Sequence, residues 1–329
     1  MDEYGIESHP DLSDPDWQRQ AEKKAWRHLR RARRRALLGR RLAWSGVLLA
    51  AVVIAGAGVY GWGKATSEDS TESTEAILPG PAVTTSASAP TVLPEIAEVD
   101  LTRPFDNTPA QNWPKDVDGL SVPTAAKVGT FSAAQVQNAY ARVKQLISTA
   151  ELDRRVLEQH DTSVYLALLS PSEQNRVRPI LADRSTDAFS GYVTLLADGF
   201  HLLPDGTRIT GTLSAHPGDP GELVVHAEYV VGYAFDPGSQ GPISSPADIE
   251  AFTRRSGDYD LYTSPPFYPS DAGLALGAGS GFNYSIACTP AKAGYLAPAF
   301  SEQTPGPADP SDEARFFDPN QPMPDRGDC

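Results

Sequence analysis

The sequence contains little cysteine: of its 329 residues only Cys288 and Cys329 are cysteines. Two cysteines are too few for a disulfide-rich scaffold or for a zinc site built from cysteine ligands. Both follow a predicted membrane span, on the side where cysteines tend to be oxidised, so we expect them to form one disulfide. Two free or intermolecularly paired thiols are the alternative.

The motifs that mark common active sites are also missing. There is no Gly-x-Ser-x-Gly elbow, and the glycine-rich run 277–281 lacks the Lys-Ser/Thr of a phosphate loop. No calcium-loop spacing occurs either. We therefore predict no cofactor, no metal and no defined catalytic centre, and we interpret 277–281 as a flexible connection.

Positive charge is scarce after the first 41 residues. The whole chain carries a net charge of −14, which divides into +4 over residues 1–41 and −18 over the remainder. An acidic region repels phosphate groups. We therefore do not expect this larger part of the chain to bind nucleic acid.

One long hydrophobic run is present, at residues 42–63, with no ionisable side chain among its 22 residues. A helix of that length reaches about 33 Å, enough to cross a hydrocarbon core of about 30 Å. Residues 19–41 hold eleven Lys or Arg, whereas the twenty residues after the run hold one. Positive charge stays on the cytoplasmic side, so we predict a single-pass cell-membrane protein with a cytoplasmic N-terminus and an extracellular C-terminal domain. A cleaved secretory signal is the alternative, but such signals have shorter apolar runs.

Composition divides the chain into five segments. We predict a basic cytoplasmic segment, a transmembrane helix, a Ser/Thr/Pro-rich linker that forms a disordered stalk, an extracytoplasmic α+β domain, and an irregular Pro/Asp-rich tail. In order, these segments are residues 1–41, 42–63, 64–95, 96–300 and 301–329.

Helical signals occupy the first half of the predicted domain. Ser132 and Gln135 have the spacing of a capping box, and apolar residues then recur at helical spacing, which predicts a helix over 132–149. A second helical run, 152–169, is interrupted near His160 and Asp161. Ser170 before Pro171 marks the start of a third helix.

Strand signals occupy the second half. Residues 208–214 and 222–235 are β-rich and are separated by turn residues at 216–221, which predicts an antiparallel hairpin. Short strands are also predicted at 192–196, 258–262 and 282–287. We therefore predict an α+β fold in which N-terminal helices pack on a curved antiparallel sheet, preceded by one transmembrane helix and the stalk.

This order of elements, over roughly residues 130–290, resembles the NTF2-like or cystatin-like superfamily. The resemblance implies a helix-covered curved sheet and no particular activity, because such folds include both enzymes and binding proteins. The layout of the whole chain is similar to that of uncharacterised single-pass membrane proteins of the actinobacterial envelope.

His226 and Glu228 are the candidate site residues. They lie two apart on the predicted strand 222–235 and so point to the same face, where they could serve as a base and its orienting carboxylate or as part of a metal site. No third ligand is evident, and if Val225, Ala227 and Tyr229 face the core, the pair faces water.

Taken together, these features predict a membrane-anchored extracytoplasmic binding or interaction module of the cell envelope without catalytic activity. Its partner would be a protein or a cell-wall component. Two alternatives remain: an extracytoplasmic hydrolase that uses His226 and Glu228, and an envelope sensor that relays a signal to the basic cytoplasmic segment.

Overall fold

The structure is a computed structural model, and it describes residues 88–94, 97–239, 243–302, 315–323 and Cys329. The predicted cytoplasmic segment 1–41 and membrane span 42–63 lie outside these residues, as does most of the predicted linker. Within the described ranges, no helix is both long enough and apolar enough to cross a bilayer.

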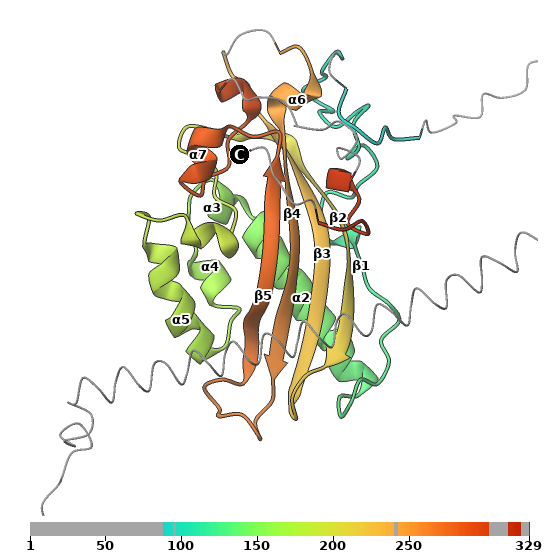
Figure 1. Cartoon of the computed structure of the whole chain (residues 1–329), viewed down its shortest axis with the longest axis vertical. Coiled ribbons are helices and arrows are strands. Elements are labelled where there is room, and N and C mark those ends of the chain that lie inside the picture. Colours follow the sequence, from blue (N-terminus) through green and yellow to red (C-terminus); the bar gives the residue numbers. More distant parts are fainter. Residues whose placement is uncertain (1–87, 95–96, 240–242, 303–314, 324–328) are drawn as a thin grey trace, which may run out of the picture. The chain divides into compact units, whose positions relative to one another are not determined.

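A five-stranded sheet forms the centre of the described part of the chain, with its strands in the order β1-β2-β3-β4-β5 (Figure 1). The strands are β1 (Leu120–Ser121), β2 (Leu202–Pro217), β3 (Glu222–Phe235), β4 (Glu250–Tyr262) and β5 (Gly273–Tyr284). The four long strands pair antiparallel, whereas β1 pairs parallel to β2, with Leu120 opposite Gly211. The sheet is therefore mixed.

The predicted fold class, N-terminal helices on an antiparallel sheet behind a transmembrane helix, is wrong. Strand β1 comes before the longer helices and joins the sheet in parallel. The short helices α6 (Pro246–Ile249) and α7 (Cys288–Lys292) lie among and after the later strands. A two-residue strand is too short to show the alternation by which a sequence reveals a strand. The parallel edge was for this reason not predicted.

Helix α2 (Ala133–Glu151) confirms the predicted helix and its start. Its capping box is complete: Gln135 N donates to Ser132 Oγ at 3.4 Å, and Ser132 N donates to Gln135 Oε1 at 2.8 Å. These two bonds satisfy backbone groups that the first helical turn leaves without partners. The apolar face then continues to Glu151, the last residue of the helix.

Three further helices follow α2, namely α3 (Arg154–Leu157), α4 (Ser163–Leu166) and α5 (Pro171–Ala182). The predicted break lies between α3 and α4, where His160 has a left-handed φ of 56°. The predicted start of α5 is also confirmed, because Ser170 Oγ accepts a hydrogen bond from Glu173 N.

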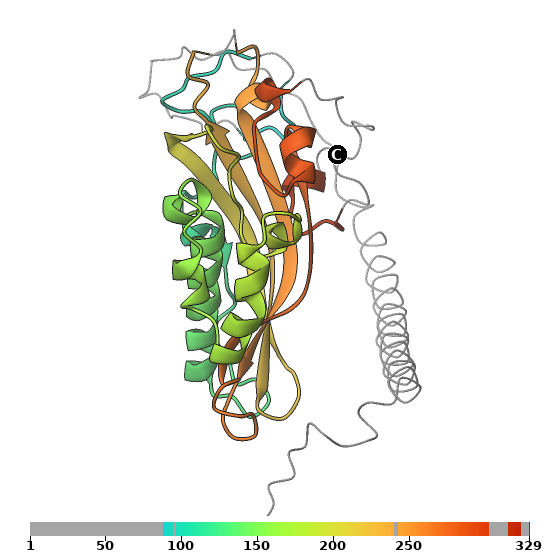
Figure 2. The ribbon, with the colours of Figure 1, turned by 90° about the vertical axis from the view of Figure 1, so that its left-hand side faces the viewer.

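The helices α2 to α5 lie on one face of the sheet (Figure 2). Their apolar side chains meet alternate residues of β3, among them Val225, Ala227, Tyr229 and Val231, all of which are at most 3% exposed. This layer is the larger of the two hydrophobic cores.

Among the described residues, a second set of apolar side chains covers the opposite face of the sheet near the connection between β3 and β4. There Phe316 and Phe317 pack against Tyr284, with ring centroids 4.6 and 5.4 Å away. These two phenylalanines belong to the C-terminal strap, which we define as residues 315–323. Arg254 of β4 is 2% exposed and donates to the carbonyls of Arg315, Pro319 and Gln321, so it fastens the strap to the sheet.

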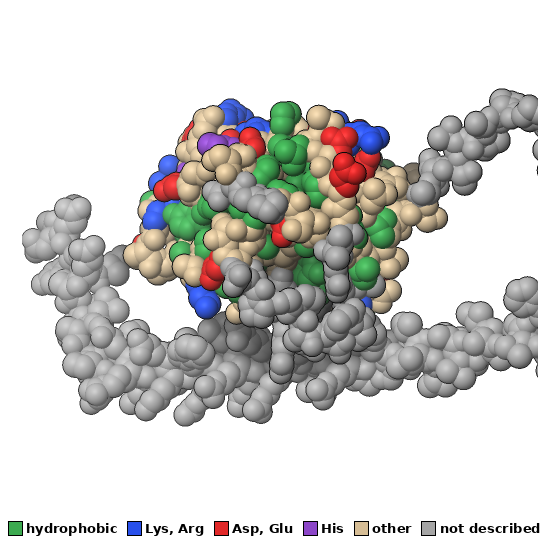
Figure 3. Space-filling view, turned by 90° about the horizontal axis from the view of Figure 1, so that it is seen from above, with side chains coloured by type: hydrophobic (Ala, Val, Ile, Leu, Met, Phe, Trp, Pro, Cys, Tyr) green, Lys and Arg blue, Asp and Glu red, His purple; other side chains and the backbone are tan. Residues whose placement is uncertain are grey.

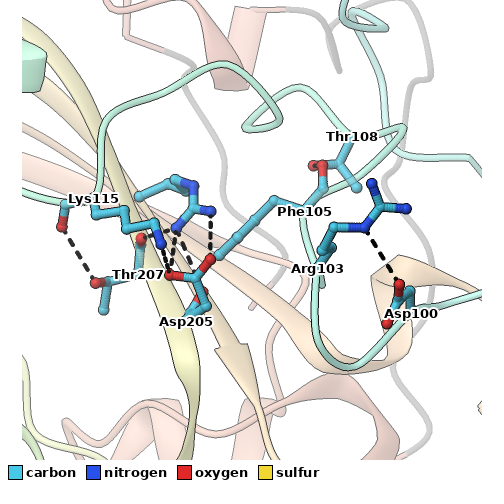
Figure 4. Close-up of polar contacts among 8 residues, drawn as sticks. Asp100, Arg103, Phe105, Thr108, Lys115, Asp205 and Thr207 are labelled. Atoms are coloured by element: carbon cyan, nitrogen blue, oxygen red, sulfur yellow. Dashed lines mark hydrogen bonds and ion pairs between the residues drawn. The ribbon is translucent and has the colours of Figure 1, made fainter.

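The segment before β1 adds a second covering to this face. The guanidinium of Arg208 lies 4.9 Å from the centre of the Phe105 ring. Arg208 and Lys115 both pair with Asp205 (Figure 4).

Seen from the end of the molecule where α6 lies, hydrophobic side chains occupy the middle of the surface and charged side chains lie toward its rim (Figure 3).

Several predicted strand limits are wrong. Strand β4 begins at Glu250 rather than at residue 258, and β5 spans Gly273–Tyr284 rather than 282–287. The run 277–281, interpreted from sequence as a flexible connection, is the middle of β5. Its glycines carry no β-branched or aromatic side chain, so the usual strand signal is missing. Residues 192–196 do not form a strand with a sheet partner either, and within them Leu196 makes an isolated bridge to Leu296.

The two cysteines are joined in the structure. Cys288 Sγ and Cys329 Sγ lie 2.13 Å apart, and the two Cα atoms are 5.3 Å apart. Composition predicts an irregular tail. The structure differs in part, because the C-terminal strap within the tail carries two buried phenylalanines. Residues 303–314 and 324–328 of the tail lie outside the described residues.

Candidate functional site

A hollow of about 510 Å³ lies between the helical layer and the sheet. We call it the interlayer hollow. It is lined by α2 from Leu146 to Glu151, by Tyr165 of α4, Arg176 of α5 and the turn 190–192, and on the sheet side by Tyr229, residues 255–259 of β4 and residues 276–281 of β5. Ligand pockets in proteins have volumes of about 300–1,000 Å³, so this hollow is large enough for a small molecule.

Missing side chains create the hollow. Gly279 of β5 lies directly opposite Gly257 of β4, and Gly281 lies opposite Arg255. The three glycines leave this part of the helix-facing side of the sheet without side chains. A Cβ built on Gly279 would meet nothing nearer than the Ser256 carbonyl oxygen at 3.5 Å, so space is open above it. At Gly281 a Cβ would lie 2.6 Å from Arg255 Nη1, because the arginine side chain extends over this glycine.

A buried carboxylate forms the inner end of the hollow. Glu151 is 3% exposed and accepts hydrogen bonds from three hydroxyls: Thr194 at 2.6 Å, Tyr233 at 2.8 Å and Tyr229 at 3.3 Å. Burial raises the pKa of both tyrosines well above the ordinary value, so both remain protonated donors. Three donors on one buried carboxylate hold it in a fixed position.

Arg255 is the cation nearest to this carboxylate. Its Nε lies 3.8 Å from Glu151 Oε1, and its Nη1 lies 3.5 Å from Asn283 Oδ1. The first contact is an ion pair without a hydrogen bond, and the second is a long hydrogen bond. Because a guanidinium carries five N–H donors, most of the donors of Arg255 are uncommitted within the described residues.

A second charge pair stiffens the outer wall. Arg176 Nε donates to Glu173 Oε2 at 2.8 Å, and Arg176 Nη1 donates to Tyr192 Oη at 3.2 Å. Glu173 also accepts a hydrogen bond from Leu276 N of β5 at 3.2 Å. The Glu173 carboxylate raises the pKa of Arg176. This network ties α5 to the edge strand and so fixes the width of the hollow on that side.

The candidate residues from the sequence, His226 and Glu228, lie on the other face of the sheet. His226 Nδ1 is 2.7 Å from Asp258 Oδ1, and His226 Nε2 is 3.6 Å from Glu228 Oε1. The structure therefore brings the pair together and adds Asp258 from β4. All three side chains are 36–38% exposed, and neither His226 nor Glu228 lines the interlayer hollow.

That exposed cluster lacks the environment that chemistry requires. No hydroxyl nucleophile is hydrogen-bonded to His226 among the described residues, and its half-exposed position does not exclude water. Within the described residues, no group of three His, Cys, Asp or Glu side chains is arranged to hold a metal. We therefore take the interlayer hollow as the candidate functional site.

Sequence reasoning missed Glu151 and Arg255, the charged pair at the inner end of the hollow. One signal was available: residues 136, 140, 143, 147 and 151 follow one helical face, so Glu151 occupies a core position of α2. A carboxylate at a core position implies buried hydrogen-bond donors around it. For Arg255 no comparable signal existed, because the strand limits of β4 were predicted eight residues too late.

Comparisons with known proteins found no match for this chain. No protein-family model matches it. No curated protein sequence and no solved structure matches it either. The resemblance to NTF2-like or cystatin-like proteins therefore remains a prediction from the order of elements.

Proposed function

We propose that this chain is a membrane-anchored, extracytoplasmic binding module whose ligand occupies the interlayer hollow. The single observation that carries the proposal is the hollow itself, a space of about 510 Å³ with a buried, fixed carboxylate and a cation at its inner end. Pockets with an apolar lining and a few convergent polar groups are the usual sites of small-molecule binding.

Binding is favoured over catalysis because Glu151 and the buried tyrosines, the groups of the hollow that could move a proton, are hydrogen-bonded to one another. Glu151 already accepts three hydrogen bonds, so it is poorly placed to take a proton from a substrate. The buried tyrosines have raised pKa values, so they are poor nucleophiles at neutral pH. A site with fixed donors and no group ready to exchange protons suits recognition.

The membrane context comes from the sequence. The apolar stretch 42–63 and the arginines before it support an anchor with the described domain outside the cell. A tag placed after Cys329 should be removed by protease added to intact cells. If the tag is protected while a cytoplasmic marker is also intact, the proposed orientation is wrong.

Ligand capture with a blocked hollow tests the binding function. The full chain, purified in lipid nanodiscs, is incubated with a small-molecule extract of its own cells, and retained compounds are identified by mass spectrometry. Gly279→Phe places a ring in the hollow without a backbone clash, since the nearest atom to its Cβ is 3.5 Å away. We expect this variant to lose the compounds that the wild-type chain retains.

Ser214→Phe is the control, because this exposed residue of β2 pairs with His226 on the other face of the sheet and does not line the hollow. It should retain the same compounds as the wild type. The proposed function is overturned if the wild type retains nothing above empty nanodiscs, or if Gly279→Phe retains the same set.

A further inference from the structure

We propose that the ligand of the interlayer hollow is a small organic carboxylate with an apolar or aromatic body, and that Arg255 binds its carboxylate group. This inference rests on the proposed function and adds the chemical class of the ligand. It follows from which charged groups in the hollow are already paired and which are not.

The acidic side chains of the lining are committed. Glu151 accepts three hydroxyl hydrogen bonds, which leaves about one of its four lone-pair positions. Asp258 contacts His226 on the far face of the sheet at 2.7 Å. A cationic ligand would therefore find little free carboxylate capacity in the hollow.

The donors, in contrast, are in excess. Arg255 has an ion-pair contact at 3.8 Å and a hydrogen bond at 3.5 Å, and the structure gives its side chain no closer polar partner among the described residues. Tyr192 Oη accepts from Arg176, which leaves its own proton available to a ligand. An unsatisfied donor set that includes a planar guanidinium matches a carboxylate, which it can bind through two parallel hydrogen bonds.

The charge of the site limits the ligand to a single negative charge. Arg176 is paired with Glu173, so the hollow offers one uncommitted cation and a buried anion beside it. A doubly charged phosphate would face Glu151 with only one guanidinium to balance it. A carboxylate brings one negative charge instead of two, so Glu151 repels it less while it pairs with the same guanidinium.

The remaining lining supplies contacts for an apolar body. Leu146, Ile147 and Leu276 line the hollow together with the rings of Tyr165 and Tyr259. Flat rings and branched aliphatic side chains pack well against aromatic or alkyl groups. The glycines of β5 let such a body lie close to the backbone of the sheet.

The test compares two probes of one shape, 3-phenylpropanoate and its neutral amide 3-phenylpropanamide, with inorganic phosphate as the anion without a body. Affinities are measured by titration calorimetry with the full chain in nanodiscs, and empty nanodiscs give the blank. We expect the carboxylate to bind at least about tenfold more tightly than the amide, since a hydrogen bond to a charged group adds about that factor. Phosphate should bind more weakly than the carboxylate.

Arg255→Gln should remove the preference for the carboxylate over the amide. Arg255→Lys keeps the charge without the planar fork, so it should retain part of the preference; it also serves if the glutamine variant does not fold. Arg178→Gln is the control, because it removes the same charge from an exposed position of α5.

Failure of this inference is distinct from failure of the proposed function. Equal affinities for the carboxylate and the amide, both abolished by Gly279→Phe, would overturn the anionic class and leave the hollow as a binding site. A preference that survives Arg255→Gln overturns the role of Arg255. If no probe binds at millimolar concentration, the carboxylate class is wrong, whereas the capture experiment still decides whether the hollow binds a ligand.

Discussion

Glu250 gives the sharpest prediction about stability. Its side chain is fully buried near Thr108 and Arg208, and neither carboxylate oxygen has a hydrogen-bond partner within the described residues. The neighbouring Thr108 hydroxyl donates to the Phe105 carbonyl at 2.8 Å. Burial raises the pKa of Glu250 well above its ordinary value of 4.5, against the weaker opposing effects of Thr108 and Arg208. The folded chain therefore keeps this carboxyl uncharged to a higher pH than the unfolded chain does.

The sign of the pH effect follows from this difference. Between the unfolded and folded pKa values the folded state binds more protons, so the free energy of unfolding falls as pH rises, by up to about 1.4 kcal/mol per pH unit from this one group. Glu250→Met removes the carboxyl and keeps a similar volume. We expect the variant to gain stability over the wild type as pH increases above about 4.5, in addition to a gain of about 1–3 kcal/mol from removing an unsatisfied buried polar group.

Urea denaturation of the compact unit Thr84–Cys329 at pH 4, 6 and 8 measures this difference. Glu98→Met, which removes an exposed glutamate in the same way, is measured alongside as the control. If the difference between Glu250→Met and the wild type is the same at all three pH values, Glu250 is not held uncharged in the folded state.

Four further predictions concern stability. Serine at both Cys288 and Cys329 should lower the free energy of unfolding by about 4 kcal/mol, from the loss of a 41-residue cross-link, and a reducing agent should do the same to the wild type but not to the variant. Arg254→Met should cost about 2 kcal/mol or more and speed amide hydrogen exchange in the C-terminal strap, whereas unchanged exchange would refute its fastening role. Ser132→Ala should lower the free energy of unfolding by about 1 kcal/mol in denaturant unfolding, and an unchanged value would mean that the capping box does not stabilise the fold. Burial and the carboxylates of β3 and β4 raise the pKa of Asp260 to about 6, so Asp260→Asn should raise the melting temperature at pH 8 and leave it unchanged at pH 3.5.

Local signals in the sequence were sufficient where an element is specified by its own residues. The capping box at Ser132, the start of α5 at Ser170 and the β-rich run of β3 each predicted the element that the structure contains. In these places propensity, pattern and capping agree, so tertiary contacts change little.

Elements that depend on a partner could not be predicted in the same way. Strand β5 is extended because β4 pairs with it, although its own glycines favour no conformation. Strand β1 has only two residues and takes its direction from β2. The contacts of the hollow join residues 151, 229 and 255, which no motif spacing relates.

Strand β4 carries adjacent arginines that serve opposite faces of the sheet. Arg254 points toward the C-terminal strap and Arg255 toward the interlayer hollow, because successive side chains of a strand alternate between its faces. A shift of β4 by one residue would turn Arg254 toward the hollow and Arg255 toward the face that carries the strap, and so would break the contacts of both. The pairing of Phe252 with Tyr284 fixes the register of β4 ahead of the two arginines, and the irregularity in the ladder comes only after Gly257.

The position of that irregularity explains how one strand can supply both features. Up to Gly257 the pairing of β4 with β5 is regular, so Arg254 and Arg255 are held rigidly, each on its own face. Beyond Gly257 the register shifts, and Tyr259 pairs with Leu276 instead of Gly277. The shift returns apolar side chains to the helix-facing side, which closes the hollow below the glycines. The glycines therefore open the hollow over a limited length, and Arg255 stands at the end of that opening nearest to Glu151.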